Sequence, residues 1–313
     1  MEFLTESRVQ ERHAHMRIDR YLAHRFSYLS RAEWQREILK GKIYYNGAAL
    51  TRNNKKIKTG DVIFYTGRDA TEPEVDANYS IIYEDDYIMG INKPGNLPVH
   101  PAGVFYHNTL LTLLQKRFQM KLHLLHRLDR ETSGVVVLAK NARFASCFQK
   151  NFYSVGKVYL ALVHGVPSAA KFIVDIPICS DPSTTLEHRR EARAGARERA
   201  CTLFASLFSF NGYSLIKAVP YTGRQHQIRV HLKYAGYPIV GDKLYGAGGS
   251  MYQDFITKGF TDEMREKLKL NRSALHSRLL RFHHPAFNKT MCLKAPLPGD
   301  MLQFIHHERG ADV

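Results

Sequence analysis

The sequence predicts an α+β protein in which a small N-terminal module precedes a larger, strand-rich domain. Apolar residues at helical spacing and then a short β-ribbon fill residues 17–65, whereas strand patterns dominate from residue 80 onward. Residues 67–79 lie between these regions and carry acidic side chains, a proline and little that is apolar, which is typical of a linker. We therefore expect a first domain over residues 1–66 and a second over residues 80–313.

Two short helices and a β-ribbon are expected in the first domain. Residues 17–26 place their apolar side chains on one helical face. Ser30 and Glu33 have the spacing of a capping box, which opens a second helix. The ribbon follows as residues 43–45, the Asn46-Gly47 turn and residues 62–65.

Basic side chains gather on one face of the second helix. Arg31, Arg36 and Lys40 point away from the apolar stripe that contains Trp34 and Ile38. Such a face can rest on the phosphates of a nucleic acid. A solvated face with no ligand is the alternative that these residues leave open.

The stretch from His126 to Lys140 joins a polar loop to an apolar strand. Its first half is dense in ionisable residues, and residues 135–139 form a continuous apolar run that indicates a buried strand. Ser133-Gly134 is a turn signal at the junction. A reactive side chain is well placed there, because a rigid strand holds a loop that can reach solvent. Asp129, between Arg127 and Arg130, is the candidate, since neighbouring guanidinium groups favour an ionised carboxylate.

Two later segments contain candidate partners for Asp129. In residues 157–164 apolar and other side chains alternate, so Tyr159 lies opposite the apolar face and faces either a cleft or the core. A helix between Gly223 and Gly236 has Arg229 one step off its apolar stripe. That guanidinium could hold a buried carboxylate or form a surface ion pair.

The remaining patterns complete a mixed set of strands and helices. Asn108 is expected to cap one helix and Asn141 another. Residues 247–272 are polar and are expected to leave the core. Strands are expected at 81–83, 87–91, 201–209, 213–219, 275–285 and 291–300, with a closing helix through Leu302, Phe304 and Ile305.

Composition and charge point to a polyanionic partner. The chain of 313 residues has 45 lysines and arginines against 29 acidic residues, a net charge of +16, which favours nucleic acid. Residues 187–199 add five arginines that either are solvated or contact RNA. The four cysteines form no C-x-x-C pair, and no stretch is apolar enough for a signal peptide or a membrane span. We therefore expect a cytoplasmic protein.

Several kinds of chemistry lack their usual motifs. No G-x-G-x-x-G or P-loop motif is present, and the histidine pairs lack the spacing of a zinc site. We therefore expect neither a nucleotide cofactor nor a metal. A hydrolase built from Ser133, His126 and Asp129 would lack the G-x-S-x-G elbow.

Five segments together resemble the RluA family of RNA pseudouridine synthases. HRLDRETSG (126–134), KVYLALVHG (157–165) and GRQHQIRVHLKYAGYPIVGDKLYG (223–246) are similar to its three motifs, and NKPGNLPVHP and LHSRLLRFHHP to its flanking segments. Asn96 departs from the small apolar residue that is more usual there. RIDRYLA, SRAEWQREILKGKIYYNG and KIKTGDVI, within residues 16–66, resemble an S4-like RNA-binding module.

The resemblance implies a fold and a set of roles. It implies a mixed, largely antiparallel sheet with a central catalytic cleft. Asp129 would be the catalytic aspartate, Tyr159 would stack on the target base and help to remove the C5 proton, and Arg229 would pair with Asp129. Arg127 would enter the RNA where the uridine leaves, and Ile228 would pack near the pyrimidine, although its place in the apolar stripe also suits the core. Arg31, Arg36 and Lys40 would bind RNA through the first domain.

The expected function is the isomerisation of one uridine in structured RNA. No atom is gained or lost, so no cofactor is expected. Large-subunit ribosomal RNA is the favoured substrate and transfer RNA the alternative, and the protein is expected to act as a monomer. A non-catalytic RNA-binding or ribosome-assembly factor on the same fold is the rival from another class. A hydrolase that uses Asp129 and His126 would instead release uracil.

Overall fold

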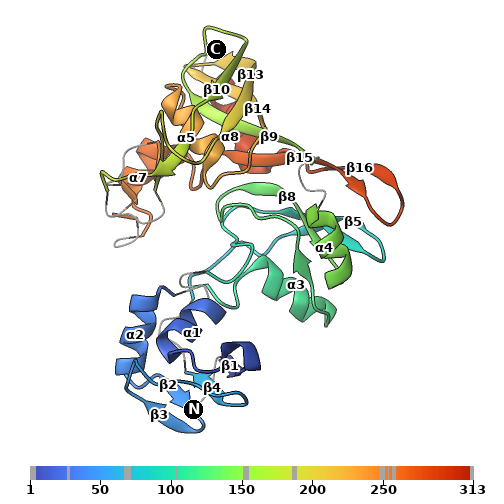
Figure 1. The fold of residues 1–313 in the computed structure, drawn as a ribbon. Helices are drawn as coiled ribbons and strands as arrows, with labels where there is room; N and C mark the ends of the chain where they lie inside the picture. The colour runs from blue at the N-terminus through green and yellow to red at the C-terminus, as the bar shows by residue number, and fades with distance from the viewer. Residues whose placement is uncertain are drawn as a thin grey trace. The chain divides into compact units, whose positions relative to one another are not determined.

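The computed structural model describes residues 5–26, 29–66, 72–102, 105–150, 155–184, 189–246, 251–252, 254–255 and 259–310. The chain forms two compact units (Figure 1). The first comprises Met1–Val75 with His100–Leu114, and the second comprises Asp76–Val99 with Gln115–Val313. Residues 100–114 thus belong to the first unit although they follow the start of the second. Within the expected linker, residues 67–71 lie outside the described residues.

The first unit packs two helices against a small antiparallel sheet. The helices are α1 (Ile18–Arg25) and α2 (Arg31–Leu39), and a short 3-10 turn precedes them at Glu11–His13. Apolar side chains from both helices and from the sheet form one core around Trp34. The strands run in the order β1 (Thr5–Arg8), β4 (Val62–Tyr65), β2 (Ile43–Tyr45) and β3 (Ala48–Leu50).

The predicted local signals of this unit are confirmed. Ser30 accepts a hydrogen bond from the Glu33 amide, and the Glu33 side chain accepts one from the Ser30 amide, so the capping box is complete. Asn46 and Gly47 both have positive φ, as the tight turn between β2 and β3 requires. β1 was not predicted, because its residues, TESR, carry no apolar pattern.

A ten-stranded, mostly antiparallel sheet forms the second unit, which confirms the predicted α+β fold. β7 (His123–Leu124) pairs with β8 (Ser133–Ala139), and β16 (Lys289–Lys294) pairs with β15 (Leu275–His284). The short β11 (Ile178–Ser180) and β12 (Arg190–Ala192) pair separately. Along the main path the order is β10 (Lys171–Asp175), β13 (Cys201–Phe210), β14 (Tyr213–Pro220), β9 (Gly156–His164), β15 (Leu275–His284), β8 (Ser133–Ala139), β6 (Ile88–Lys93) and β5 (Ser80–Glu84).

Helices cover the two halves of this sheet separately. α5 (Gln227–Tyr234) and α8 (Gly299–Gly310) pack with β9, β13 and β14 in one core, as Figure 1 shows. α4 (Ala142–Lys150) packs with β8, β15 and β16 in another. α3 spans Leu110–Phe118 and α7 spans Asp262–Leu268. None of the helices described is long and apolar enough to cross a membrane.

The junction between the two halves lies at β8 and β15, the one parallel pair among the described strands. Gly134 lies there with φ +107, and an added Cβ would come within 2.2 Å of the Ser277 carbonyl oxygen. A side chain would therefore force the two strands apart. The predicted Ser133-Gly134 signal thus marks a close approach of strands, and the loop before it is held at the centre of the sheet.

Some sequence expectations need correction. Asn141 caps α4 as predicted, because its side chain accepts from the Phe144 amide (2.8 Å). Asn108 does not cap α3: the Thr109 hydroxyl accepts from the Thr112 amide (3.3 Å). The strand expected at 291–300 ends at residue 294, and α8 begins at Gly299. In the expected excursion, residues 247–250, 253 and 256–258 lie outside the described residues, and α7 occupies part of the rest.

Candidate active site

Asp129 lies in the loop that leads from β7 into β8. The Thr132 amide closes this loop by donating to the Asp129 carbonyl oxygen (3.1 Å). β8 follows at once and is buried along its whole length. The Asp129 side chain keeps 28% of its surface exposed. A carboxylate is therefore anchored to a rigid strand and can still be reached by a ligand.

Arg229 joins Asp129 to a second carboxylate, that of Asp242. Its Nη1 donates to Asp129 Oδ2 (3.0 Å). Its Nε and Nη2 donate to Asp242 Oδ2 (2.6 Å) and Oδ1 (2.9 Å), which is a bidentate pair. The structure thus brings together Asp129 and Arg229, which lie 100 positions apart, and adds Asp242, which no sequence pattern indicated.

Asp242 is fully buried and fixes the direction of the Arg229 side chain. Besides the guanidinium, the amides of Leu244 and Tyr245 donate to Asp242 Oδ1 (3.0 Å each). A buried arginine requires a buried anion nearby. This requirement was the signal in the sequence that could have indicated an acidic partner for Arg229. The sequence pattern alone did not say which acidic residue would fulfil it.

The environment of Asp129 favours its charged form. Burial raises the pKa of this carboxyl, but the charges of His226 and Arg229 and the hydrogen bond from Arg229 together hold the pKa below its ordinary value. The charge of Asp242 raises the pKa of Asp129, but the effect of His226 and Arg229 is larger. Asp129 is therefore ionised at neutral pH, as a nucleophile or a base must be.

Tyr159 lies on β9, and its ring is half-buried against the core below α5. β9 pairs with β15 so that Tyr159 is opposite Ser277, and the two side chains are hydrogen-bonded. Burial, together with the charge of Asp129, raises the pKa of Tyr159 to about 12. The hydroxyl therefore keeps its proton at neutral pH, and the ring lies within electrostatic reach of Asp129.

His226 also contacts Asp129, and sequence reasoning missed it. Its Nε2 lies 3.8 Å from Asp129 Oδ2, and its Nδ1 lies 2.8 Å from the Tyr245 hydroxyl. The Arg229 guanidinium stacks over the Tyr245 ring, with its Cζ 4.9 Å from the ring centroid. A lone histidine at the start of a helix carries no pattern that separates it from a capping or surface residue.

Comparisons with known proteins agree with this geometry. The RNA pseudouridylate synthase family profile matches residues 87–234, and the S4 domain profile matches residues 16–63. The chain is 32% identical over 311 residues to an uncharacterized RNA pseudouridine synthase of Bacillus subtilis, covering 94% of each chain. It is 32% identical to the ribosomal large subunit pseudouridine synthase D of Vibrio cholerae, covering 92% of this chain and 89% of that protein.

This chain belongs to the RluA family of RNA pseudouridine synthases. Among solved structures, it is similar to human RNA pseudouridylate synthase domain containing 4, with 30% identity and a TM-score of 0.57. That similarity covers 73% of this chain and 92% of the human chain. The expected pseudouridine synthase fold and the S4 module at the N-terminus are therefore confirmed.

In this pseudouridine synthase, buried basic side chains fasten the loop that carries Asp129. Lys93 is fully buried and donates through Nζ to the carbonyl oxygens of Pro94 (2.8 Å), Leu97 (2.9 Å) and Arg130 (3.0 Å). Arg130 directly follows Asp129. Lys93 therefore ties the turn after β6 to the loop that carries Asp129.

Glu131 fastens the same loop from the other side. Its carboxylate accepts from Lys243 Nζ (2.8 Å) and from the Ser273 amide (2.9 Å). Arg272 donates to the Glu131 carbonyl oxygen (3.3 Å) and passes over Gly95, where an added Cβ would lie 2.1 Å from the arginine Cδ. Asn96 comes next with φ +53, a conformation that asparagine tolerates. Its departure from the family pattern is therefore compatible with this turn.

Replacing Lys93 with methionine is expected to destabilise the second unit. Three buried or partly buried carbonyl oxygens would lose their donor, and we expect the free energy of unfolding to fall by about 2–4 kcal/mol. Far-UV circular dichroism during urea unfolding measures this, because the sole tryptophan, Trp34, reports only on the first unit. Lys171→Met, at an exposed position of β10, is the control. Equal stability of the two variants would contradict the fastening role.

Ser133 and His126 have structural partners of their own. Ser133 is buried and its hydroxyl is 3.0 Å from His276 Nδ1. His126 Nε2 accepts from the Val137 amide (3.2 Å), and burial, with the charge of Lys157, lowers its pKa to about 3. Both residues therefore shape the loop and the strand after it, and their contacts do not form a hydrolase triad.

The predicted RNA contacts of the second unit differ in exposure. Arg127 is exposed, as contact with RNA requires. Ile228 is 6% exposed and lies in the core below α5, so its packing near a pyrimidine stays a prediction. In the arginine-rich stretch, residues 187–188 lie outside the described residues. β12 lies in the rest of that stretch, where Arg189 pairs with Asp181 (3.2 Å) and Arg190 pairs with Glu198.

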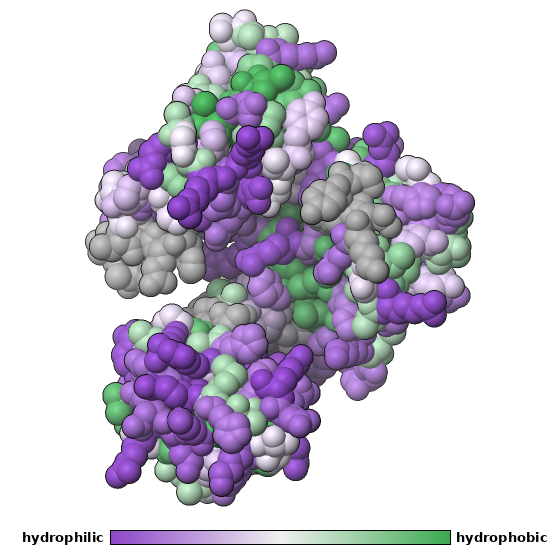
Figure 2. Space-filling view, in the orientation of Figure 1, coloured by the Kyte–Doolittle hydropathy of each residue, from purple (hydrophilic) through white to green (hydrophobic). Residues whose placement is uncertain are grey.

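In the first unit, a buried carboxylate organises the predicted basic face. Asp19 has no exposed surface and accepts from Arg17, Arg31 and Gln35 at 2.7–3.1 Å. Arg36 is exposed, and Lys40 is exposed beside Glu37 (3.5 Å). Figure 2 shows hydrophilic side chains over most of the visible face of this unit.

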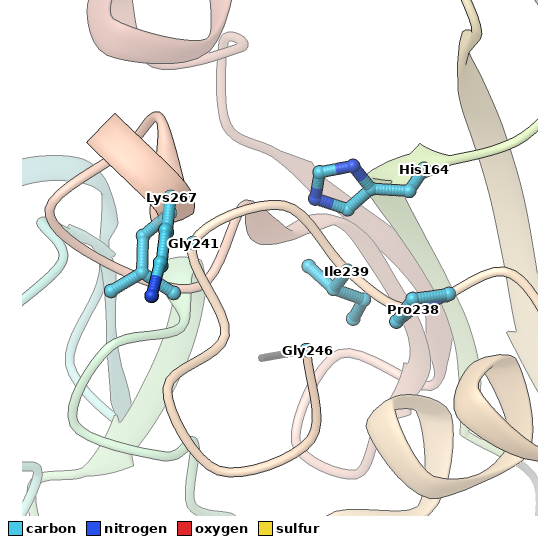
Figure 3. A pocket seen from close by; sticks show the side chains of 7 residues that line it. His164, Pro238, Ile239, Gly241, Gly246 and Lys267 are labelled. Carbon is cyan, nitrogen blue, oxygen red and sulfur yellow. The ribbon is translucent and has the colours of Figure 1, made fainter. Parts of the chain in front are cut away.

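A hollow of about 180 Å³ lies elsewhere in the second unit (Figure 3). None of the predicted site residues lines it. Within the described ranges, no group of three or more histidine, cysteine or acidic residues could hold a metal ion. The hollow is lined by His164, Pro238, Ile239, Gly241, Gly246, Lys267 and Leu268.

Proposed function

We propose that this pseudouridine synthase modifies a uridine of large-subunit ribosomal RNA, with Asp129 as its catalytic carboxylate. Two relatives that align along most of their length, from Vibrio cholerae and Blochmanniella floridana, are named ribosomal large subunit pseudouridine synthase D. The net charge of +16 supports a large polyanionic substrate. The cytoplasmic location, the monomeric state and the absence of a cofactor stay predictions.

The contact between Arg229 and Asp129 carries this proposal. Pseudouridylation breaks the N1–C1′ bond, forms a C5–C1′ bond, removes the proton from C5 and leaves one on N1. Asp129 would either attack C1′ or take a proton from C2′, and both steps need an ionised carboxylate. Arg229 keeps that charge in place, and Asp242 keeps Arg229 in place.

Tyr159 would support the flipped base beside Asp129. A uridine in folded RNA must leave its stack, and an aromatic ring replaces part of the lost stacking. The hydroxyl, with a pKa of about 12, stays protonated and bonded with Ser277. We therefore assign stacking to the ring, and help from Tyr159 in removing the C5 proton stays a prediction, because a protonated hydroxyl cannot accept that proton without giving up its own.

The test uses ribosomal RNA from a strain that lacks this gene. The wild-type protein is incubated with large-subunit RNA and, separately, with transfer RNA, and pseudouridines are mapped by mass spectrometry. Pseudouridine in the large-subunit RNA supports the proposal. Modification of transfer RNA alone would replace the substrate, and release of uracil would indicate a hydrolase. Full rescue of the strain by an inactive Asp129 variant would favour a non-catalytic assembly factor.

The S4 module is expected to bind phosphates through α2. Removing Arg36 and Lys40 together, as Arg36→Ala with Lys40→Ala, should weaken RNA binding and lower the salt slope of log affinity by about 2. The double variant Lys171→Ala with Lys294→Ala removes the same charge from exposed positions of the second unit. Filter binding across salt concentrations compares the two. The same slope for both variants would mean that α2 has no special role in binding.

A further inference from the structure

His226 stands where the chain turns into α5, in a left-handed backbone conformation that few residues with a side chain adopt. Its φ is +57, which is left-handed, and its side chain makes no capping hydrogen bond to the helix. A residue with a Cβ adopts this conformation at a cost in energy, and asparagine adopts it more easily than histidine. The described contacts of the ring therefore lie outside α5, with Tyr245 and Asp129.

The histidine ring joins Tyr245 to Asp129. Nδ1 lies 2.8 Å from the Tyr245 hydroxyl, and Nε2 lies 3.8 Å from Asp129 Oδ2. The ring is largely buried, with 11% of the side chain exposed. A contact of 3.8 Å is longer than a hydrogen bond, and such contacts often shorten when the substrate is bound.

The hydrogen bonds of Tyr245 decide which ring nitrogen carries the proton. Its oxygen accepts from the Arg190 amide (2.9 Å). Burial raises the pKa of its hydroxyl, which therefore keeps its proton. Among the described contacts, His226 Nδ1 accepts the hydrogen bond that the Tyr245 hydroxyl donates. A neutral imidazole has one N–H group, so in that form the hydrogen is on Nε2. A protonated ring carries a hydrogen there too, so Nε2–H faces Asp129 in both forms.

Both contacts to the Asp129 carboxylate fall on one oxygen. Arg229 Nη1 and His226 Nε2 both approach Oδ2, and among the described residues no side-chain or amide donor forms a hydrogen bond with Oδ1. We propose that His226, oriented by Tyr245, is a positioning residue that acts with Arg229 to restrain Oδ2 of Asp129 and so presents Oδ1 to the target nucleotide. This inference rests on the proposed catalytic role of Asp129.

Two substitutions separate the function of the two ring nitrogens. His226→Asn suits the left-handed backbone and can still accept from Tyr245, but it is too short to reach Asp129. His226→Gln places an amide nitrogen near the position of Nε2 and loses the contact with Tyr245. We expect the single-turnover rate of His226→Asn to fall about 10–100-fold, with RNA affinity within about two-fold of wild type. His226→Gln should retain a larger part of the rate.

A spectrum of the protein without RNA provides a readout independent of activity. In protein labelled with ¹⁵N-histidine, the His226 signal is assigned as the one lost in His226→Asn. We expect a proton on Nε2, and a shift of the Nδ1 signal in Tyr245→Phe. The melting temperature of His226→Asn, which should stay near that of wild type, excludes a general loss of folding.

The outcomes are distinct for this inference and for the proposed function. The positioning role would be overturned if the spectrum showed that Nε2 carries no proton. It would also be overturned if the single-turnover rate of His226→Asn equalled that of wild type. A rate that falls together with RNA affinity and melting temperature would also overturn it, because that is the signature of a structural role. Failure of the wild-type protein to modify large-subunit RNA would refute the proposed substrate, whereas the tautomer measurement would still decide the state of His226.

Discussion

Asp129→Asn is expected to abolish pseudouridine formation, with a fall in single-turnover rate of about 10⁴-fold or more. The change replaces one oxygen by an amide nitrogen of similar size and removes the charge. Arg229 would still have Asp242 as its partner, so the fold should persist. The loss would therefore reflect the chemistry of the carboxylate, which can no longer act as a nucleophile or a base.

The matched control is Asp86→Asn, which makes the same change at an exposed position between β5 and β6. Its rate should equal that of wild type. Binding of Asp129→Asn to RNA should stay within about three-fold, because phosphate contacts dominate affinity. If Asp129→Asn kept more than a tenth of the wild-type rate, Asp129 would not be the catalytic residue.

Asp242→Asn is expected to have the second-largest effect, on both stability and rate. The two oxygens of Asp242 receive five hydrogen bonds, two from Arg229, two from backbone amides and one from the Ser273 hydroxyl, and an asparagine would turn its own amide group toward some of these donors. Removing one partner of a buried ion pair costs about 3–5 kcal/mol of the free energy of unfolding. Because Arg229 would also lose its orientation, we expect the single-turnover rate to fall about 10²-fold.

The pH dependence of stability provides a second measure of the Asp242 pair. Burial raises the pKa of the Asp242 carboxyl, but Arg229 and the amides of Leu244 and Tyr245 hold it below its ordinary value of 3.8. A group whose pKa is lower in the folded state stabilises the fold above its unfolded pKa. That stabilisation is lost as the pH falls from about 4 through the folded value. The acid loss should be smaller in Asp242→Asn than in wild type.

Urea unfolding followed by far-UV circular dichroism, at pH 7 and in steps down to pH 3, measures both effects. Asp86→Asn again serves as the control, because its carboxylate is exposed. A stability of Asp242→Asn within 1 kcal/mol of wild type at pH 7 would contradict the buried pair. A normal rate with reduced stability would mean that Asp242 does not orient Arg229 for the reaction.

Local signals in the sequence predicted local structure well. The capping box at Ser30 and the Asn46-Gly47 turn both involve residues within a few positions of one another, so the pattern contains the whole interaction. β8 was equally clear, because an apolar run of that length must be buried. The Thr109 cap was missed because Asn108 and Thr109 are both good capping residues, and only the position of the helix start chooses between them.

The partners of the predicted residues could not be read in the same way. Arg31 was expected only as part of a basic face, yet it pairs with Asp19, which is twelve residues away and buried in α1. His226 and Asp242 belong to the same constellation as Asp129, but neither follows a helical or strand period. Ion pairs between distant segments depend on how strands and helices pack, and no local pattern records that packing.

The sequence by itself determined the family, the α+β architecture and Asp129 as the candidate carboxylate, because contiguous motifs and hydrophobic periods carry that information. Only the tertiary structure decided what surrounds Asp129. It placed Arg229 between two carboxylates, His226 on the same oxygen as Arg229, and Lys93 beneath the loop. The physical reason is that charge and direction at a buried site arise from groups far apart in sequence, and folding alone brings those groups within a few ångströms.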